Sequence, residues 1–264
     1  MHLEDAVVTG HEDFQGGYRL LTVVSPCIAP EVKPGQFVHL KIPRLNEALL
    51  RRPFSVYQAQ DDRLAILYKN IGRGTDAMTT LRSGETISLI GPLGHPFPPR
   101  QEGTYPVLVA GGYGMAALYL VAKTTALPGL AFFGGAAEAD ILCVREFESM
   151  GWDVRVTTED GSLGRRGVVT DALDAWLAER RADKKPEFYG CGPNGMLRAI
   201  SDRAQAGGWT AWVSMDRNMG CGVGACLTCV QKVQASDGSD WTWARVCREG
   251  PVFECRQIVW EEEA

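Results

Sequence analysis

The sequence of 264 residues is 45% hydrophobic and 22% charged, which is the composition of an ordinary globular protein with room for one to three domains. The formal net charge of −5 and the pI near 5.5 argue against nucleic-acid binding, which normally requires a basic face. No segment approaches the ~18 apolar residues of a membrane span, and the acidic N-terminus lacks the hydrophobic core of a secretory signal. We therefore expect a cytoplasmic protein that binds neither nucleic acid nor membranes.

Residues 1–99 have the pattern of an antiparallel domain. Short segments rich in β-branched and aromatic residues alternate with glycine and proline. These segments are 18–26, 36–42, 54–59, 64–69 and 86–91. Strands of this length and spacing predict an antiparallel β-barrel or sandwich, and the proline-rich segment 95–106 marks its end near residue 99.

Residues 100–208 change to an alternation of strands and helices. Apolar runs typical of buried parallel strands occupy 106–110, 130–135, 152–160 and 187–192. Helical patterns occupy 115–127, 170–182 and 196–208. This alternation predicts a doubly wound parallel α/β sheet. A short third domain, 209–264, contains glycines and most of the cysteines, so the fold class is multidomain β and α/β.

Four cysteines near the C-terminus have the spacing of an iron–sulfur ligand set. Cys221, Cys226 and Cys229 follow the pattern C-x4-C-x2-C, and 17 residues separate Cys229 from Cys247. This is the plant-type ferredoxin pattern, in which four thiolates ligate the two irons of a [2Fe–2S] cluster. Glycines lie beside and between the first ligands, at Gly220, Gly222 and Gly224. They allow the unusual dihedrals of a loop that wraps a cluster and let backbone N–H groups approach its sulfides.

Other interpretations of the eight cysteines stay open. Disulfides rarely persist in a reducing compartment, so a structural zinc site is the main alternative to the cluster, although zinc ligands usually form two separated pairs. Cys255 is an alternative fourth ligand, but Cys247 directly follows the apolar segment 241–246, and we expect Cys255 not to be a ligand. A lone cysteine is usually a small buried residue, which is our expectation for Cys27 and Cys143.

Two loops of the α/β region are candidate nucleotide-binding loops. Gly112, Gly114 and Ala117 fit G-x-G-x-x-A between a strand and a helix, where N–H groups and the helix dipole favour phosphate. Cys191 and Gly192 end a later strand, and ligands of such sheets bind at the carboxyl ends of strands. The G-x-G-x-x-A motif alone is weak evidence for nucleotide binding, because glycine turns between strands and helices are common. The motif is usually followed roughly 20 positions later by an acidic residue, and the only candidate here, Glu138, comes somewhat late.

The first domain contains two further candidate anion sites. The segment RRPFS, residues 51–55, offers a planar arginine fork, a rigid proline and a serine hydroxyl. The segment NIGRGTDAM places Gly72, Gly74 and Thr75 before a short helical stretch. Taken alone, such residues beside a turn are usually only solvated.

The motifs RPFS, GRGT, GPLG, GGYG and YGCGP, in this order, resemble those of the ferredoxin reductase superfamily. The resemblance implies a β-barrel that holds FAD and an α/β domain that holds the nicotinamide nucleotide. It implies FAD contacts from Arg52, Pro53, Phe54, Ser55, Gly74 and Thr75. It implies NAD contacts from Gly111, Gly112, Gly114, Cys191 and Gly192, with Cys191 near the point where nicotinamide and flavin meet and therefore the candidate catalytic residue.

The C-terminal segments SMDRNMGCGVGACLTCV and RVCREGPVFE narrow the resemblance to electron transfer subunits of the two-subunit, NAD-linked dihydroorotate dehydrogenases. It extends over essentially the whole chain. It implies FAD, a [2Fe–2S] cluster and NAD as cofactors, and a catalytic partner subunit with FMN, in a heterotetramer of two copies of each. Electrons from dihydroorotate, an intermediate of pyrimidine biosynthesis, then pass through this chain to NAD+. The sequence offers no candidate base for dihydroorotate oxidation, which fits this division of labour.

The sequence departs from the superfamily pattern at four positions. These are Ala110, Tyr113, Ala117 and Asp216, and they bear on the geometry of nucleotide binding rather than on the cofactor set. Arg165 and Arg166 favour a 2′-phosphate if they line the nucleotide pocket, but adjacent arginines more often face water, so we favour NAD over NADP.

Three alternative functions follow from the same motifs. The first is a related reductase subunit that serves another partner, such as a hydrogenase, a sulfur reductase or a glutamate synthase. The second is a stand-alone NADH:ferredoxin reductase. The third is a non-enzymatic nucleotide sensor stapled by zinc. We expect the tryptophans of the third domain either to build a partner interface or to pack a small core. They are Trp241, Trp243 and Trp260.

Overall fold

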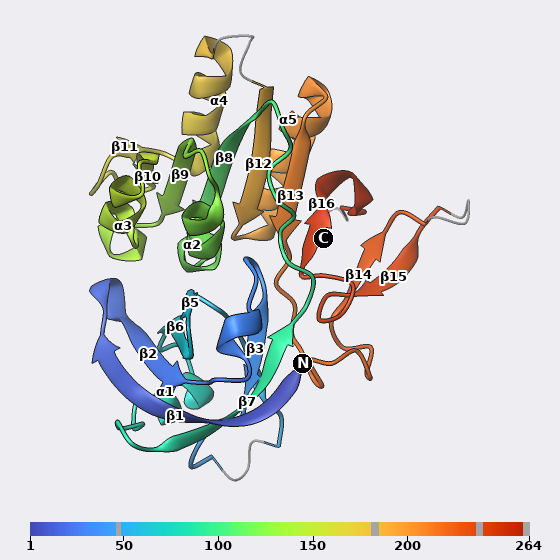
Figure 1. The fold of residues 1–264 in the computed structure, drawn as a ribbon. Helices are drawn as coiled ribbons and strands as arrows, with labels where there is room; N and C mark the ends of the chain where they lie inside the picture. Colours follow the sequence, from blue (N-terminus) through green and yellow to red (C-terminus); the bar gives the residue numbers. More distant parts are fainter. Residues whose placement is uncertain (46–48, 181–184, 236–239, 261–264) are drawn as a thin grey trace.

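Two seven-stranded sheets, one above the other in Figure 1, make up most of the described fold, and a two-stranded ribbon lies beside them. The structure is a computed structural model that describes residues 1–45, 49–180, 185–235 and 240–260. None of the helices in these ranges is long and apolar enough to cross a membrane.

The first sheet is an antiparallel half-barrel, as the sequence predicts. In spatial order its strands are β4 (Arg52–Ser55), β3 (Phe37–Leu40), β7 (Thr86–Leu93), β1 (His2–Asp13), β2 (Tyr18–Val24), β6 (Arg63–Lys69) and β5 (Gln58–Gln60). Each described pair of neighbours is antiparallel. Alternate residues of β7 are buried, so one face of the sheet packs a core around Leu21, Ile66 and Leu89. Helix α1 (Arg73–Met78) and the 3₁₀ turns η1 (Gln15–Gly17) and η2 (Ala29–Glu31) complete this part.

The prediction of one strand over residues 54–59 is wrong. The segment divides at Val56 and Tyr57, whose side chains are buried. Residues before the division pair with β3 as β4, and residues after it pair with β6 as β5. The division therefore lets one short segment contribute to both edges of the half-barrel.

The second sheet is parallel, as predicted, except for its last strand. In spatial order its strands are β11 (Arg165–Arg166), β10 (Asp153–Thr158), β9 (Leu130–Gly135), β8 (Thr104–Gly111), β12 (Lys185–Cys191), β13 (Thr210–Ser214) and β16 (Val252–Glu254). Strand β16 runs antiparallel to β13. The helices are α2 (Gly114–Thr124), α3 (Val144–Ser149), α4 (Val169–Glu179) and α5 (Asn194–Gly207), and the 3₁₀ turns are η3 (Glu138–Asp140) and η4 (Cys255–Gln257).

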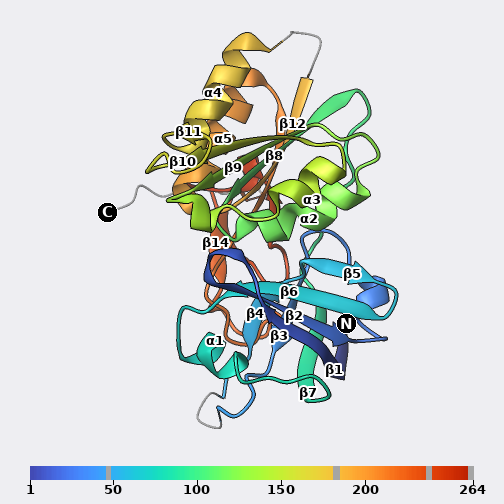
Figure 2. The ribbon, with the colours of Figure 1, turned by 90° about the vertical axis from the view of Figure 1, so that its left-hand side faces the viewer.

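Helices cover both faces of this sheet (Figure 2). Val107 and Val109 of β8 belong to the core cluster formed with α4 and α5. Leu108 and Ala110, which point to the other face, belong to the cluster formed with α2 and α3. Because both faces are buried, the central strands are continuously apolar, which is the pattern expected for a doubly wound sheet.

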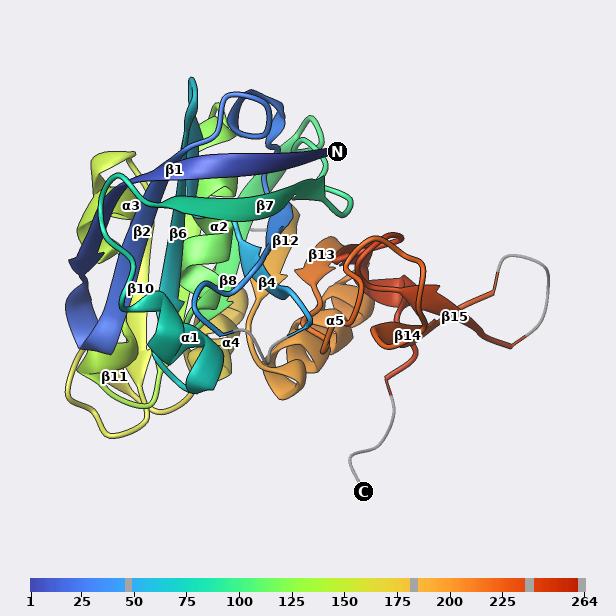
Figure 3. The ribbon, with the colours of Figure 1, turned by 90° about the horizontal axis from the view of Figure 1, so that it is seen from below.

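The C-terminal segment is interwoven with the second sheet. Strands β13 and β16 belong to that sheet, although both lie beyond residue 208, where we expect the nucleotide domain to end. Between them the chain forms a loop with Cys221, Cys226 and Cys229, residues 215–229, which we call the cysteine loop. It is followed by the ribbon of β14 (Val230–Val233) and β15 (Thr242–Arg245), and this ribbon extends to one side in Figure 3. Val246 and Cys247 pack in the same core cluster as α5. The division of the chain at residues 99 and 208 stays a prediction.

Candidate functional site

A cavity of about 240 Å³ lies where the half-barrel, the second sheet and the cysteine loop meet. From the half-barrel it is lined by Phe37, Pro53, Phe54, Ser55, Leu67, Tyr68, Lys69, Ile71 and Thr75. From the second sheet and its loops it is lined by Tyr113, Ala116, Cys191, Gly192, Ser214, Met215 and Asp216, and from the C-terminal segment by Met219 and Pro251. We call this space the junction cavity.

Most of the residues expected to contact FAD line the junction cavity. Pro53, Phe54, Ser55 and Thr75 are among its lining residues. Thr75 shapes the turn before α1, because its Oγ1 accepts hydrogen bonds from the N–H groups of Ile71 (3.0 Å) and Gly72 (3.1 Å). Aromatic, hydroxyl and backbone groups of this kind fit a flavin ring and its polar edge.

Arg52 and Gly74 are not among the residues that line the junction cavity. The exposed guanidinium of Arg52 donates to the carbonyl oxygen of Leu50 at 2.8 Å. Gly74 lies beside it, since a Cβ on Gly74 would be 4.0 Å from Arg52 Cγ. Both residues are next in the chain to residues that do line the cavity, Pro53 and Thr75.

A second cavity of about 480 Å³ lies at the carboxyl ends of β8, β9, β10 and β12. Its lining residues include Gly111 and Gly112 after β8, Gly134 and Gly135 after β9, and Pro193 at the start of α5. This edge is where ligands of open α/β sheets bind. We call this space the nucleotide cavity.

Two acidic residues that the sequence analysis did not select also line the nucleotide cavity. They are Asp140, in the 3₁₀ turn after β9, and Glu159, directly after β10. Asp140 forms an ion pair with Lys69 of the half-barrel at 2.9 Å. The sequence did contain one indication that Glu159 belongs to the site, because this residue lies at the carboxyl end of a predicted strand. Glu138, the weak candidate, is exposed, and its N–H donates to Ser162 Oγ at 2.7 Å.

Gly114 has a packing role rather than a place in the cavity wall. A Cβ on Gly114 would lie 2.0 Å from the carbonyl oxygen of Cys191. Helix α2 therefore begins in direct contact with the end of β12, and only glycine allows this approach. The two expected nucleotide loops are brought together at this point.

Cys191 and Gly192 lie on the wall between the two cavities. Both line the junction cavity, whereas the next residue, Pro193, lines the nucleotide cavity. Burial and the nearby Asp216 carboxylate raise the pKa of Cys191 to about 12, so its thiol is neutral at physiological pH. Tyr113 closes the same wall by donating its hydroxyl to Asp216 Oδ2 at 2.8 Å. A ligand in each cavity would meet at this wall.

The cysteine loop presents thiol sulfurs to backbone donors. Cys221 Sγ accepts from the N–H groups of Ala225 (3.2 Å) and Cys226 (3.3 Å), and Cys229 Sγ accepts from the N–H of Cys247 (3.4 Å). Gly222 and Gly224 adopt left-handed φ angles of 69° and 82°, which turn the loop around these sulfurs. Backbone N–H groups directed at two of the four cysteine sulfurs fit the environment of an iron–sulfur cluster.

The thiols differ in their electrostatics. Hydrogen bonds from Thr228 lower the pKa of the half-buried Cys226 to about 6, which favours its thiolate form. Burial raises the pKa of Cys247 to about 12. Cys255 is fully buried beside Ser201, and its backbone carbonyl accepts from Ser201 Oγ. In the described part of the chain, no three His, Cys, Asp or Glu side chains are gathered around a position for a single metal ion.

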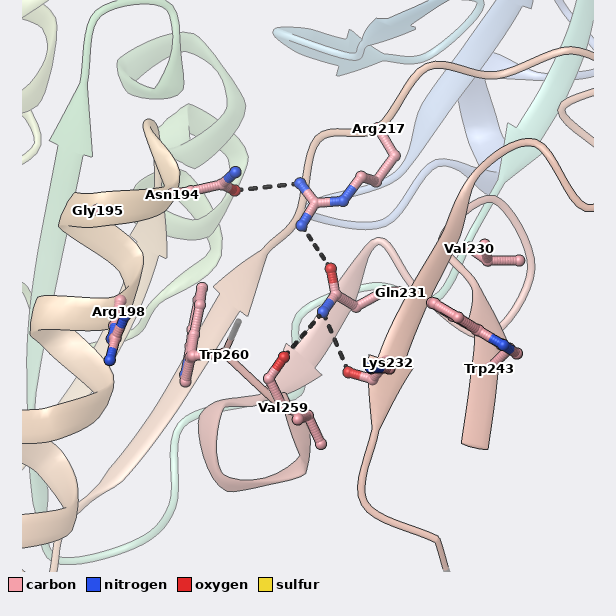
Figure 4. Close-up of a pocket in the computed structure, with 10 residues that line it drawn as sticks. All are labelled: Asn194, Gly195, Arg198, Arg217, Val230, Gln231, Lys232, Trp243, Val259 and Trp260. Atoms are coloured by element: carbon pink, nitrogen blue, oxygen red, sulfur yellow. Dashed lines mark hydrogen bonds between the residues drawn. The ribbon is translucent and has the colours of Figure 1, made fainter. Parts of the chain in front are cut away.

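Arg217 connects the cysteine loop to the nucleotide loop at α5 (Figure 4). Its guanidinium donates to Asn194 Oδ1 at 3.1 Å and to Gln231 Oε1 at 2.5 Å. Gln231 in turn donates to the carbonyl of Lys232. These bonds cross a polar pocket of about 410 Å³ between α5 and the ribbon, and they hold β14 beside the start of α5.

Seven residues that the sequence analysis considered lie outside the junction and nucleotide cavities. Cys27 is exposed, so the expectation that it is buried is wrong: the chain turns at the surface there, its N–H donates to Glu4, and Ile28 is buried instead. Cys143 is buried, as expected. Arg165 is exposed on β11, as is Arg166, and neither lines the nucleotide cavity. Trp241 and Trp243 are exposed, and Trp260 is half-buried.

Comparison with known proteins agrees with this geometry. The family described as the iron–sulfur cluster binding domain of dihydroorotate dehydrogenase B matches residues 216–259. The solved structure of an NADH-dependent reduced ferredoxin–NADP oxidoreductase superposes with a TM-score of 0.82 at 28% identity, covering 97% of this chain and 90% of the other. The half-barrel, the nucleotide sheet and the cysteine loop together define an oxidoreductase of the ferredoxin reductase type with an iron–sulfur domain.

Relatives that match most of the chain narrow this class. The dihydroorotate dehydrogenase B (NAD(+)) electron transfer subunit of Geobacillus thermodenitrificans is 36% identical, covering 90% of this chain and 91% of its own. The subunit of the same name from Desulforamulus reducens is 35% identical, covering 90% of each chain. The chain therefore belongs to the family of dihydroorotate dehydrogenase B electron transfer subunits. The predicted cofactor set of FAD, a [2Fe–2S] cluster and NAD is confirmed at the level of this family.

Proposed function

We propose that this chain carries electrons between an FMN-containing catalytic subunit, which oxidises dihydroorotate, and NAD+. The observation that carries the proposal is the position of the junction cavity, whose wall is shared with the nucleotide cavity on one side and reaches Met219 of the cysteine loop on another. A flavin in this cavity would lie between a nicotinamide and an iron–sulfur cluster. That order is the one a dehydrogenase subunit needs to connect single-electron and hydride transfer.

The residues of the chain divide among three cofactors. We assign FAD to Arg52, Pro53, Phe54, Ser55, Gly74 and Thr75. We assign NAD to Gly111, Gly112, Gly114, Cys191 and Gly192, and the [2Fe–2S] cluster to Cys221, Cys226, Cys229 and Cys247. When bound, FAD exchanges a hydride with NAD(H) and single electrons with the cluster.

The protein's own contribution is orientation and exclusion of water. The buried, neutral thiol of Cys191 forms an uncharged patch on the wall where the two rings would meet. Gly192 leaves this wall thin, because its left-handed φ of 156° and lack of a side chain allow the backbone of Gly111 to approach. Hydride transfer requires about 3–3.5 Å between the reacting atoms, so the two rings would have to meet beside this thin wall and not across it.

The acidic lining of the nucleotide cavity favours NAD over NADP. Glu159 and Asp140 line this cavity, while the exposed Arg165 and Arg166 do not. A carboxylate near the adenosine ribose accepts hydrogen bonds from its hydroxyls and repels a 2′-phosphate.

The partner surface is proposed around the cysteine loop. Leu227, between two proposed ligands, is 73% exposed, and Trp243 on the adjoining ribbon is 53% exposed. Exposed apolar and aromatic residues beside an electron exit are suited to a stable protein contact. We place the FMN subunit here, in a cytoplasmic heterotetramer with two copies of each chain.

Co-purification with the catalytic subunit tests this function. The complex is expected to reduce NAD+ in the presence of dihydroorotate. Cys226→Ser is expected to abolish that activity while NADH-dependent ferricyanide reduction at the flavin persists, and Cys255→Ser, the matched control, is expected to retain both. A complex without dihydroorotate-dependent NAD+ reduction would contradict the proposal.

A second candidate is a related reductase subunit that serves another partner. It is favoured by the solved NADH-dependent reduced ferredoxin–NADP oxidoreductase, which aligns with 97% of this chain. In that case the purified chain reduces a ferredoxin with NADH or NADPH, and native co-purification yields a partner without dihydroorotate activity.

A further inference from the structure

The imidazole of His39 connects the half-barrel to the cysteine loop. His39 lies in β3 with 1% of its surface exposed, and its Nδ1 is 3.2 Å from the carbonyl oxygen of Cys221. A carbonyl oxygen only accepts, so Nδ1 carries the proton and donates it to this bond. Nε2 is buried and has no hydrogen-bond partner among the described residues. The bond to Cys221 is therefore the polar contact through which the ring acts on the loop.

The same histidine shares a sheet face with residues that line the junction cavity. In the ladder between β3 and β4, His39 lies opposite Pro53, so their side chains share a face of the sheet with Phe37. Phe37 and Pro53 both line the junction cavity. Arg51 anchors this end of β3 by donating to the carbonyl oxygens of Ser88 (2.8 Å) and His39 (3.4 Å). His39 thus stands where the proposed flavin-binding sheet meets the loop.

The loop is shaped to receive the ring. Gly222 adopts a left-handed φ of 69°, and a Cβ at this position would lie 2.3 Å from His39 Nδ1. A side chain on residue 222 would therefore displace the imidazole as well as strain the backbone. The peptide between Cys221 and Gly222 lies directly against the ring, with its carbonyl oxygen in the hydrogen bond.

We propose that His39 is a positioning residue that holds the Cys221–Gly222 peptide, and with it the Cys221 thiolate, against the flavin-binding sheet. The proposal rests on the proposed function in one respect, because it takes Cys221 as a cluster ligand. Under this proposal, the surroundings of the cluster are fixed in part by a residue of the first sheet that is distant in sequence from every cysteine of the loop. A fixed loop keeps the distance between flavin and cluster constant while electrons pass.

Two substitutions at His39 test the hydrogen bond. His39→Leu removes the donor and keeps an apolar side chain of moderate size, whereas His39→Asn retains an N–H donor near the position of Nδ1. The dithionite-reduced His39→Leu chain is expected to show shifted and broadened cluster EPR signals. Its cluster is also expected to lose iron to a chelator about tenfold faster, as loss of one hydrogen bond to a buried carbonyl predicts. His39→Asn is expected to restore the wild-type spectrum and rate, which a purely space-filling role would not.

Substitution of the loop provides an independent test if His39→Leu does not fold, which its FAD content will reveal. Gly222→Ala presses a methyl group into the imidazole. Gly224→Ala is the matched control, since it has the same left-handed strain but would meet only the flexible Arg248 side chain. Gly222→Ala is expected to accelerate iron release well beyond Gly224→Ala. Unchanged EPR signals and iron release in the His39→Leu and Gly222→Ala chains overturn the positioning role alone, whereas wild-type protein without iron overturns the proposed function as well.

Discussion

Gly114 shows how one missing side chain brings two loops together. A Cβ there would lie 2.0 Å from the Cys191 carbonyl oxygen, whereas a Cβ on Gly195, in the first turn of α5, would meet nothing within 4 Å. Gly114→Ala is therefore expected to lower the free energy of unfolding by about 1–3 kcal/mol, the usual cost of overpacking, and to weaken NADH binding. Gly195→Ala is expected to leave stability unchanged or raise it by up to about 1 kcal/mol. Thermal unfolding and NADH titration of both variants check this, and equal effects of the two would contradict it.

Glu159 provides the residue-scale test of nucleotide preference. It lines the nucleotide cavity, whereas Glu138 is exposed and does not. Glu159→Lys replaces a repulsive charge with an attractive one for a 2′-phosphate. It is expected to raise the ratio of kcat/KM for NADPH to that for NADH by about tenfold, a change worth about 1.4 kcal/mol. Steady-state ferricyanide reduction with the two nucleotides measures the ratio, and the control Glu138→Lys should leave it near the wild-type value.

At the scale of single residues, the spacing of motif residues in the sequence was a better guide to candidate site residues than expectations about which side chains are buried. The cysteine pattern and the G-x-G turn are local, so the sequence alone selected Cys221, Cys226 and Gly112 as candidates, and Gly112 lines the nucleotide cavity. Glu159 was not selected, because its place in the cavity depends on the order of strands in the sheet. Cys27 was misjudged because its N–H bonds to Glu4, 23 positions earlier in the sequence, in a surface turn that the local pattern does not show.

At the scale of elements, strongly periodic segments were predicted well. The pattern over 130–135 matches β9 (Leu130–Gly135), and the pattern over 196–208 overlaps α5 (Asn194–Gly207). Strand β1 (His2–Asp13) was missed, because only Ala6 and Val8 of its residues are fully buried and the rest are largely polar. Its strand conformation comes from pairing with β2 and β7 on either side, which is not visible in the local sequence.

The side-chain contact between His11 of β1 and Tyr68 of β6 makes the stability of the half-barrel depend on pH. The Nε2 of His11 lies 2.9 Å from the hydroxyl of Tyr68, a residue that lines the junction cavity. Burial lowers the pKa of His11 from its usual 6.5, and the nearby Arg19 acts in the same direction. The unfolded chain therefore binds a proton more readily than the folded chain, so this stabilisation is present above pH 6.5 and is lost as pH falls through the lowered pKa.

His11→Gln removes this titration while keeping a polar side chain. The melting temperature of the wild-type holoprotein is expected to fall more steeply between pH 7 and pH 5 than that of the variant. Differential scanning calorimetry across this range measures both curves. Two curves of the same slope would show that His11 does not contribute to the acid sensitivity of the half-barrel.

At the scale of the whole molecule, the C-terminal segment contributes strands to the second sheet and also inserts the cysteine loop between those strands. Strands β13 and β16 complete the second sheet, and the cysteine loop and ribbon lie between them in the sequence. The sequence predicted a boundary near residue 208, since the change in composition is local, whereas the pairing of β16 with β13 joins residues about 40 positions apart. The core cluster of α4 and α5 also includes Cys229 and Val246.

This arrangement predicts that the chain tolerates removal of the residues between β13 and β16, but not removal of everything after residue 208. Met215 N–H donates to the Pro251 carbonyl oxygen at 2.9 Å, so the two ends of the segment lie side by side. Replacing residues 217–249 by a short glycine linker keeps β13 and β16 in the sheet. The excised chain is expected to fold, bind FAD with reduced affinity because Met219 is lost from the junction cavity, and reduce ferricyanide with NADH.

A chain that ends at residue 208 lacks both strands. It leaves the outer edge of β12 unpaired and exposes Leu197 and Ile200, which are fully buried in the complete chain. Exposed apolar surface beside an unpaired strand favours aggregation, so this chain is expected to be insoluble or to bind no FAD. Flavin absorbance and size-exclusion chromatography of the two chains decide the matter. A soluble, flavin-loaded chain ending at residue 208 would show that the third domain begins where the composition changes and that β13 and β16 are dispensable for the nucleotide sheet.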